Sequence, residues 1–293
     1  MKIGKLGVWA FTEGFSSADS AAFAQRVEGW GYSALWIPEA VGRNALVSAS
    51  WLLANTRTLI VATGIANIYG RDPVSMAAGQ LTLAEQSGGR FLLGIGVSHA
   101  PLVEGVRGHS YDQKPVARMR AYLEGMKKLR YMAPQPAEPP KTVLAALGPR
   151  MIELSGSDAD GAHPYNVTLA HTALARKLLG PDKLLCVEQA VVLETDPVKA
   201  RAIARGMLGR YMPFVNYRNS WLREGFTEAD LADGGSDAFV DAVIAWGDEA
   251  ALSARIQAHW DAGADHVCIQ ALSPSGSPLP DETALAALAG VAE

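Results

Sequence analysis

Short apolar runs alternate along this chain with longer segments of helical spacing. The runs are rich in β-branched and large apolar residues, a pattern typical of strands that are buried on both faces. Several segments between them open with helix-start residues, such as Ser16 or the Asp72-Pro73 pair, and end at glycine. The apolar runs cover residues 6–11, 34–37, 59–65, 91–97, 143–147, 163–167, 184–193 and 266–272. This alternation predicts repeated units of one strand and one helix.

Eight such units are the number that closes a parallel sheet on itself. We therefore predict an α/β fold, a (β/α)8 TIM barrel, as a single domain over residues 1–293. Residues 197–262 exceed one crossover helix, which predicts a helical insertion between strands seven and eight. A doubly wound open sheet is the competing architecture. It would normally carry a glycine-rich turn after strand one, and residues 7–15 (GVWAFTEGF) lack that spacing.

Composition limits the partners more than the fold. Hydrophobic residues make up 49% of the chain and charged residues 19%, so a large core is expected and disorder is not. The formal net charge of −4 argues against nucleic acid or an anionic membrane as the main partner, which favours a small-molecule substrate. Neither a leader segment nor a run of membrane-spanning length stands out, and a cytoplasmic protein is expected.

Motifs of several common enzyme classes do not occur in the sequence. The six histidines form no HxxxH pair and no His/Cys cluster, so no metal site is predicted. A G-x-S-x-G motif and a P-loop are also missing, which argues against common hydrolases and NTPases. Cys186 and Cys268 fall inside apolar runs, where a thiol usually serves as a small buried hydrophobe.

Glycines and polar residues collect at the carboxyl ends of the expected strands, where barrel enzymes place their sites. Residues 94–99 (GIGVSH) offer bare backbone that can lie against a planar ring. Residues 145–150 (AALGPR) enter a helix with free N–H groups that can hold a phosphate, and Arg150 adds a charge. Both segments also have ordinary interpretations, as a tight turn and as a solvated helix start.

Three side chains are candidates for acid–base chemistry. His99 and His163 are the best, because imidazole titrates near neutral pH. A lone histidine is nevertheless more often structural. Glu39 follows the second apolar run, and the alternative interpretation of this residue is an ordinary turn carboxylate exposed to water. A pocket at the strand ends is one reason for such residues to occur there, since burying them unpaired is costly.

Several of these segments resemble the bacterial luciferase-like family, and more closely its coenzyme F420-dependent branch. The similarity extends over nearly the whole chain. The matching segments are far more specific together than any one of them alone. Its strongest pieces are residues 35–40 (LWIPEA), 62–73 (ATGIANIYGRDP), 89–104 (GRFLLGIGVSHAPLVE), 143–154 (VLAALGPRMIEL), 160–165 (DGAHPY) and 261–270 (DAGADHVCIQ). The resemblance implies a luciferase-like barrel with an insertion and a cofactor bound by the strand ends.

The resemblance also implies a cofactor and its contacts. The cofactor is coenzyme F420, with FMN as the alternative, and a non-proline cis peptide is expected at Gly64-Ile65 in a bulge behind the ring. The residues implied at the cofactor are Glu39, Gly64, Ile65, Asn67, Gly96, Val97, Ser98, Ala146, Leu147, Gly148 and Pro149. Sugar-phosphate dehydrogenases of this branch carry a histidine after strand two, and here the sequence reads Glu39-Ala40. That departure leaves His99 and His163 as the expected proton donors.

We therefore expect hydride transfer between the deazaflavin C5 and an unsaturated or carbonyl-type organic substrate. An FMN-dependent monooxygenase supplied by a separate reductase is the alternative enzyme. A non-catalytic cofactor-binding barrel is the alternative from another class, since fold does not fix function. A homodimer or larger homo-oligomer, formed through the apolar outer helices, is implied by the family resemblance.

Overall fold

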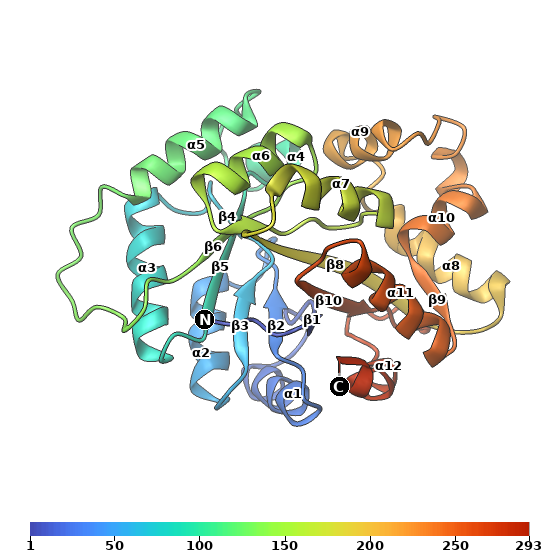
Figure 1. The fold of residues 1–293 in the computed structure, drawn as a ribbon, viewed down its shortest axis with the longest axis horizontal. Helices are drawn as coiled ribbons and strands as arrows, with labels where there is room; N and C mark the ends of the chain where they lie inside the picture. Colours follow the sequence, from blue (N-terminus) through green and yellow to red (C-terminus); the bar gives the residue numbers. More distant parts are fainter. Residues whose placement is uncertain (293) are drawn as a thin grey trace.

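Eight parallel strands close into a barrel in the computed structural model, which describes residues 1–292 (Figure 1). The closing strand pairs on one side with the first strand and on the other with the seventh, in the registers Leu6↔Val267 and Cys186↔His266. The barrel strands, in order around the barrel, are β1 (Leu6–Trp9), β2 (Ala34–Ile37), β3 (Ile60–Thr63), β5 (Phe91–Gly96), β6 (Thr142–Leu144), β7 (Gly161–Ala162), β8 (Leu184–Leu193) and β10 (His266–Ala271). The predicted barrel is confirmed, and the open sheet is excluded.

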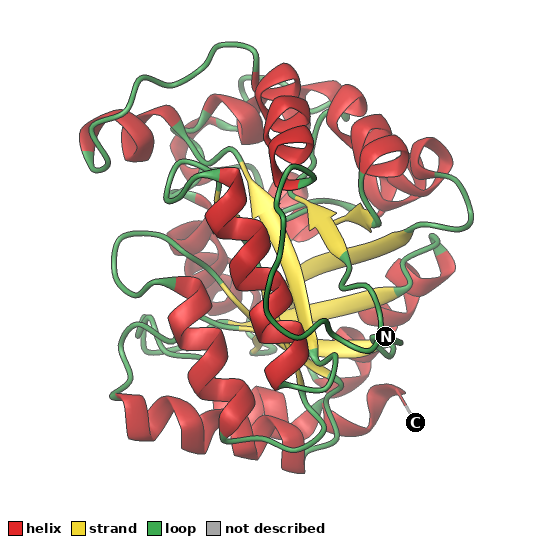
Figure 2. Ribbon diagram, turned by 90° about the vertical axis from the view of Figure 1, so that its left-hand side faces the viewer, coloured by secondary structure: helices red, strands yellow, loops and turns green. Residues whose placement is uncertain are grey.

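An outer layer of helices covers the strands (Figure 2). Two predicted helix starts are confirmed: the Ser16 side chain accepts from the N–H of Asp19, and Asp72 accepts from the N–H of Ser75. The helices that follow the barrel strands and the chain end are α1 (Ser17–Gly29), α2 (Ala45–Ala54), α3 (Pro73–Gln86), α4 (Ala100–Gly105), α5 (Pro115–Met126), α6 (Pro149–Asp158), α7 (Leu169–Leu179), α11 (Glu249–Asp261), α12 (Glu282–Ala287) and the 3-10 turn η2 (Ala289–Ala292).

The barrel interior is filled by inward-facing side chains. Cys186 and Cys268 belong to this filling as free, buried thiols, and burial raises the pKa of both well above the ordinary value. The expectation that they act as small hydrophobes is therefore confirmed. The complete buried cluster is Ile3, Trp9, Ala34, Trp36, Ile60, Ala62, Leu92, Val143, Cys186 and Cys268.

The predicted helical insertion between strands seven and eight is present, but it also contains a strand. Trp221 and Phe239 pack edge to face at 5.0 Å in a second buried cluster, so this region has an apolar centre of its own. Its elements are α8 (Pro197–Leu208), α9 (Val215–Arg223), the 3-10 turn η1 (Ala232–Gly234), α10 (Asp237–Val243) and β9 (Ala245–Gly247) (Figure 1). β9 pairs in parallel with the last part of β8, in the register Val191↔Ala245. It has three residues, which are too few for a recognisable periodicity.

Strand six was predicted at residues 163–167, and this position is wrong. The strand is β7, directly before this run, and an added side chain at Gly161 would come within 2.1 Å of the Leu184 carbonyl oxygen. The backbones of β7 and β8 therefore approach each other only because this residue has no side chain. The run 163–167 contains Pro164, which has no N–H for a ladder, and it forms a loop at the barrel mouth.

Strand three is divided by a bulge. β3 ends at Thr63, the peptide bond Gly64-Ile65 is cis, and β4 (Ala66–Asn67) then pairs with β5. The cis bond expected from the family resemblance is confirmed at that position. The Thr63 hydroxyl donates to the Gly94 carbonyl oxygen at 2.7 Å and accepts from the Gly94 N–H at 2.9 Å. These two bonds hold the residue before the bulge against the backbone of β5.

Candidate functional site

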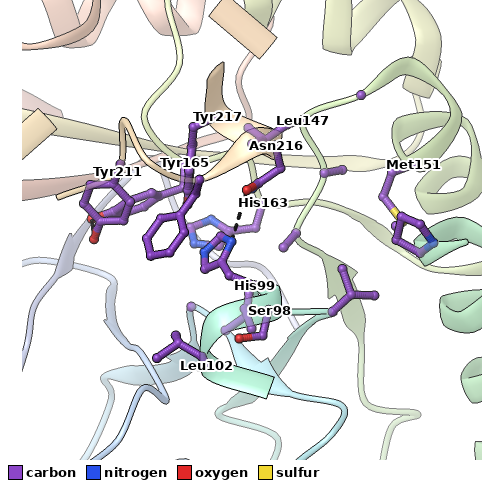
Figure 3. Close-up of a pocket in the computed structure, with 18 of the residues that line it drawn as sticks. Ser98, His99, Leu102, Leu147, Met151, His163, Tyr165, Tyr211, Asn216 and Tyr217 are labelled. Carbon is purple, nitrogen blue, oxygen red and sulfur yellow. Dashed lines mark hydrogen bonds between the residues drawn. The ribbon is translucent and has the colours of Figure 1, made fainter. Parts of the chain in front are cut away.

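A cavity of about 760 Å³ opens at the carboxyl ends of the strands. Its volume lies within the usual range of small-molecule and cofactor sites. The residues predicted for the site that line this cavity are Glu39, Gly64, Ile65, Val97, Ser98, His99, Ala146, Leu147, Gly148, Pro149 and His163. Figure 3 shows several of them around one space, with Ser98 and His99 facing Leu147 and the insertion residues Asn216 and Tyr217. The structure thus brings together segments that are far apart in the sequence.

Two residues predicted to contact the cofactor lie behind the cavity wall. Asn67 is buried, and its side-chain oxygen accepts from the N–H of Tyr69 at 2.9 Å, so it shapes the turn after the bulge. A side chain added at Gly96 would meet the Ile65 side chain at 2.8 Å. Gly96 therefore gives space to Ile65, which does line the cavity. Both residues support the wall and do not form its surface.

The Glu39 carboxylate is occupied by protein donors. It accepts from the N–H of Asn67 at 2.8 Å and from the N–H of Ala45 at 3.3 Å, and it forms an ion pair with Arg71. Only 4% of its side chain is exposed. These contacts connect the bulge to the start of α2, so the structure argues against the predicted catalytic role and indicates a positioning role for Glu39.

The start of α6 faces the cavity without a capping side chain. Gly148 is the N-cap residue, Pro149 occupies the first turn, and no side chain caps the helix. A side chain added at Gly148 would meet only Arg223 within 4 Å, at 3.8 Å, so the space in front of the helix is open. Arg150, Arg210 and Arg223 all line the same cavity. Free N–H groups at a helix start with arginines nearby are the usual partners of a phosphate.

His163 lies deep in the cavity lining and is fixed in one tautomer. Its Nδ1 lies 2.8 Å from the Cys186 carbonyl oxygen, which can only accept, so Nδ1 carries the hydrogen and Nε2 a lone pair. The ring stacks on Trp36 at 4.3 Å. Burial lowers the pKa of His163 to about 4, against a weaker opposing effect of the Cys186 bond. The ring is thus neutral near pH 7 and has no hydrogen at Nε2, which argues against the predicted acid role.

His99 is held by the insertion. Its ring stacks on Phe214 at 4.2 Å with 8° between the planes, and its Nδ1 lies 3.1 Å from the Asn216 side-chain oxygen. Figure 3 draws this bond across the cavity. Since the amide oxygen accepts, Nδ1 donates, and Nε2 is left as an acceptor. Burial lowers the pKa of His99 from 6.5, so the neutral form is favoured near pH 7 and an acid role for this residue remains a prediction that the geometry does not favour.

A tyrosine pair at the cavity was not predicted from the sequence. Tyr165 and Tyr211 both line it, with their hydroxyl oxygens 2.8 Å apart, and the Tyr165 hydroxyl also donates to the Gln270 side-chain oxygen at 2.8 Å. Tyr211 comes from the segment between α8 and α9. The one available signal was the density of aromatic residues at 211–221 (YMPFVNYRNSW), which does not by itself place them at the barrel mouth.

Glu188 is a buried carboxyl group next to this pair. Its Oε2 accepts from the N–H of Asn166 at 3.0 Å, and its Oε1 has no partner among residues 1–292. Burial raises the pKa of Glu188 to about 8, and the Asn166 bond opposes this only weakly. The carboxyl group therefore carries a proton at neutral pH and does not place a full charge inside the barrel.

A pH dependence of stability follows from Glu188. Between its ordinary pKa of 4.5 and about 8, the folded protein keeps this proton while the unfolded chain releases it. The contribution of Glu188 to the free energy of unfolding should therefore fall with rising pH in this window, by on the order of 1.4 kcal/mol per pH unit. Urea unfolding at pH 6 and pH 7 gives this contribution as the difference between the slope of wild type and the slope of Glu188→Gln. An identical slope in the variant would show that Glu188 is ionised in the folded protein.

Among residues 1–292, no group of three or more His, Cys, Asp or Glu side chains is placed to hold a metal ion. In the same part of the chain, no helix is both long and apolar enough to span a membrane.

A closed parallel barrel with a cavity at its carboxyl mouth defines a class of proteins, the barrel enzymes whose strand-end loops bind the ligand. The family model of the luciferase-like monooxygenases matches residues 4–266. The chain therefore belongs to the luciferase-like monooxygenase family of enzymes. This finding confirms the family that the sequence motifs indicated.

Two named relatives are similar to this chain in sequence. A Mycobacterium tuberculosis protein, Rv3520c, whose name places it among coenzyme F420-dependent oxidoreductases, is 28% identical over 234 residues, which cover 77% of this chain and 60% of the relative. A 5,10-methylenetetrahydromethanopterin reductase of Methanolobus tindarius is 27% identical over 212 residues, covering 63% of this chain and 64% of the relative. The chain thus matches less than two thirds of the length of either relative.

Solved structures share the fold at low sequence identity. An F420-dependent secondary alcohol dehydrogenase, in complex with an F420-acetone adduct, has a TM-score of 0.77 at 16% identity and covers 99% of this chain and 98% of that one. The oxygenating constituent of 3,6-diketocamphane monooxygenase from Pseudomonas putida, in complex with FMN, has a TM-score of 0.71 at 14% identity, with coverage of 99% and 98%. At these identities the likeness supports the fold alone.

Proposed function

We propose that this protein is an F420-dependent oxidoreductase that transfers a hydride between the deazaflavin and a small organic substrate. The observation that carries the proposal is the cavity between the bulge at Gly64-Ile65 and the uncapped start of α6. It combines an apolar surface for a ring with donors for a phosphate, the two parts that such a cofactor requires. The names of the F420-dependent relatives support the same cofactor.

The residues present fit a cofactor with a ring and a phosphate. Ile65 would lie against the ring, and the open position in front of Gly148 would take the phosphate, with Arg223 beside it. When bound, F420 supplies hydride chemistry at its C5. The carbonyl oxygen of Gly64 accepts from the Trp9 indole N–H at 3.0 Å, so the backbone beneath the ring is held in place.

The protein also controls the surroundings of the reacting groups. Trp9, Phe11 and Tyr165 form an aromatic wall, with ring centroids 4.9 and 5.0 Å apart, that excludes water from one side of the cavity. The insertion contributes Phe214, which covers His99. A substrate with an apolar body is therefore favoured over a charged one.

An FMN-dependent monooxygenase that receives reduced flavin from a separate reductase is the second candidate. The FMN complex of a structurally similar protein favours it, because that barrel has the same fold. The cavity itself would accept either phosphate-bearing cofactor. Cofactor preference therefore separates the two candidates.

Binding measurements test the proposal. The purified protein is titrated with F420, FMN and riboflavin, and mass spectrometry under native conditions identifies the bound species. We expect F420 to bind roughly tenfold or more tightly than FMN, and riboflavin, which has no phosphate, to bind more weakly than FMN. The reverse preference between F420 and FMN would favour the monooxygenase. Tight cofactor binding without turnover of any substrate panel would favour a non-catalytic barrel.

The proposal includes a homo-oligomer formed through the outer helices. Val47 and Trp51 on α2 and Val74 on α3 are exposed apolar side chains, at 69%, 45% and 42%. Light scattering coupled to size exclusion measures the mass in solution. A cytoplasmic location and a single domain over residues 1–293 stay predictions.

A further inference from the structure

Three uncharged polar side chains form a hydrogen-bond chain at one end of the cavity. Gln270 lies on β10, Tyr165 follows β7, and Tyr211 belongs to the insertion. The distances are 2.8 Å from the Gln270 oxygen to the Tyr165 hydroxyl and 2.8 Å from that hydroxyl to the Tyr211 hydroxyl. Figure 3 shows Tyr165 and Tyr211 side by side, on the opposite side of the view from Met151 in the first turns of α6. In this view the chain is thus separated from the first turns of α6.

The direction of these hydrogen bonds is set by Gln270. Its side-chain oxygen can only accept, so the single hydroxyl hydrogen of Tyr165 points to it. The bond between the two phenols then requires the hydrogen of Tyr211, which donates to the Tyr165 oxygen. Both hydrogens are thereby used within the chain. The Tyr211 oxygen keeps lone pairs and has no hydrogen for a ligand.

Both phenols remain neutral over the range in which proteins are assayed. Burial raises the pKa of Tyr211 to about 12 and raises the pKa of Tyr165 well above its usual value. The group that faces a ligand is thus a neutral oxygen acceptor. It is not a phenolate, which would bind cations.

A second acceptor lies near the Tyr211 oxygen. His99 uses Nδ1 as donor to Asn216, which leaves Nε2 as an acceptor. The other neighbours of Tyr211 are aromatic rings, Tyr217 with its centroid at 5.1 Å and Phe214 at 6.3 Å. Arg210 and the Tyr217 hydroxyl also line the cavity and can donate, so the Tyr211 oxygen and His99 Nε2 are two acceptors within a mixed polar and aromatic surface. An apolar ligand that brings its own hydrogen-bond donor is complementary to these two acceptors.

We propose that the Tyr211 oxygen, oriented by Tyr165 and Gln270, binds the polar group of the substrate as an acceptor, so that the preferred substrate is an apolar ring compound carrying an O–H or N–H. This inference rests on the proposed function and adds a substrate class to it. A carbonyl compound of the same skeleton would place its oxygen against the lone pairs of Tyr211. Tyr211 is then a binding and specificity residue, and Tyr165 and Gln270 are positioning residues.

The test uses a matched pair of probes, 1-indanol and 1-indanone, which differ in whether the oxygen carries a hydrogen. Calorimetry or ligand-observed NMR measures their dissociation constants for the purified protein without cofactor, and again with oxidised F420. In wild type we expect 1-indanol to bind roughly fivefold to tenfold more tightly than 1-indanone. Tyr211→Phe should reduce this preference to within about twofold, because the acceptor is removed.

Tyr165→Phe gives the sharpest expected result. It removes the acceptor for the Tyr211 hydrogen, which then becomes free to donate into the cavity, so binding of 1-indanone should improve and the preference should disappear or reverse. Tyr32→Phe is the matched control. This variant also loses a buried hydroxyl bond, to the Leu285 carbonyl oxygen in α12. Tyr32 is not among the residues that line the cavity. Its probe preference should equal that of wild type.

Several outcomes would overturn the inference. These are equal or tighter binding of 1-indanone in wild type, an unchanged preference in Tyr211→Phe, and no measurable binding of either probe. The proposed function fails separately, if F420 does not bind wild type. The preference for 1-indanol can still be measured in that case, because the tyrosine chain is complete in the protein without cofactor.

Discussion

Gly94→Ala is expected to lower the free energy of unfolding by about 4 kcal/mol, the size of a severe steric change in a core. A methyl group at Gly94 would come within 2.0 Å of the Thr63 carbonyl oxygen, which is backbone and cannot rotate away. The same change would push the two strands apart at the bulge and disturb both hydrogen bonds between Thr63 and Gly94. Chemical unfolding followed by tryptophan fluorescence measures the loss, and cofactor binding should weaken with it.

Gly206→Ala is the matched control for that substitution. Gly206 lies in α8 with nothing within 4 Å of the added methyl group, and its backbone is helical. Alanine should therefore stabilise the protein by roughly 0.5–1 kcal/mol, the usual difference between the two residues within a helix. A small loss in Gly94→Ala, similar to that of an ordinary surface change, would show that β3 and β5 can separate at this point without cost.

The barrel could be predicted because alternation of strands and helices is a property of the local sequence. The parts that were missed depend on contacts between distant segments. β7 consists of Gly161 and Ala162, and it is a strand because these small residues let it approach β8. β9 is three residues of the insertion that pair with the end of β8. Neither segment has enough residues for a periodicity that could be recognised.

The functional site shows the same difference between features set by local sequence and features set by distant contacts. Its backbone-made parts were predicted, the start of α6 because glycine and proline mark it in the sequence, and the bulge at Gly64-Ile65 from the family resemblance. The side-chain chemistry was not predictable, because donor and acceptor positions depend on partners. The sequence offers His163 as a proton donor, but its Nδ1 hydrogen points to the Cys186 carbonyl oxygen, which leaves Nε2 with a lone pair.

Gly148→Asp is expected to weaken F420 binding roughly 100-fold while leaving the fold at least as stable as wild type. Aspartate is a preferred N-cap residue, so it should satisfy the free N–H groups of α6 and add a few tenths of a kcal/mol of stability. The same carboxylate would occupy the place of the phosphate, repel it, and lie near Arg223. Fluorescence titration measures the dissociation constant, and thermal unfolding without cofactor measures the stability.

Gly148→Asn distinguishes the effect of a negative charge at this position from the effect of filling the space in front of the helix. Asparagine caps the helix equally well but brings no negative charge, so F420 binding should weaken by roughly tenfold, between wild type and Gly148→Asp. Riboflavin has no phosphate, and its affinity should be nearly the same in all three proteins. An affinity for F420 that does not change in Gly148→Asp would mean that the anionic part of the cofactor binds elsewhere. The opposite directions of the effects on stability and on binding make a folding defect distinguishable from loss of the anion site.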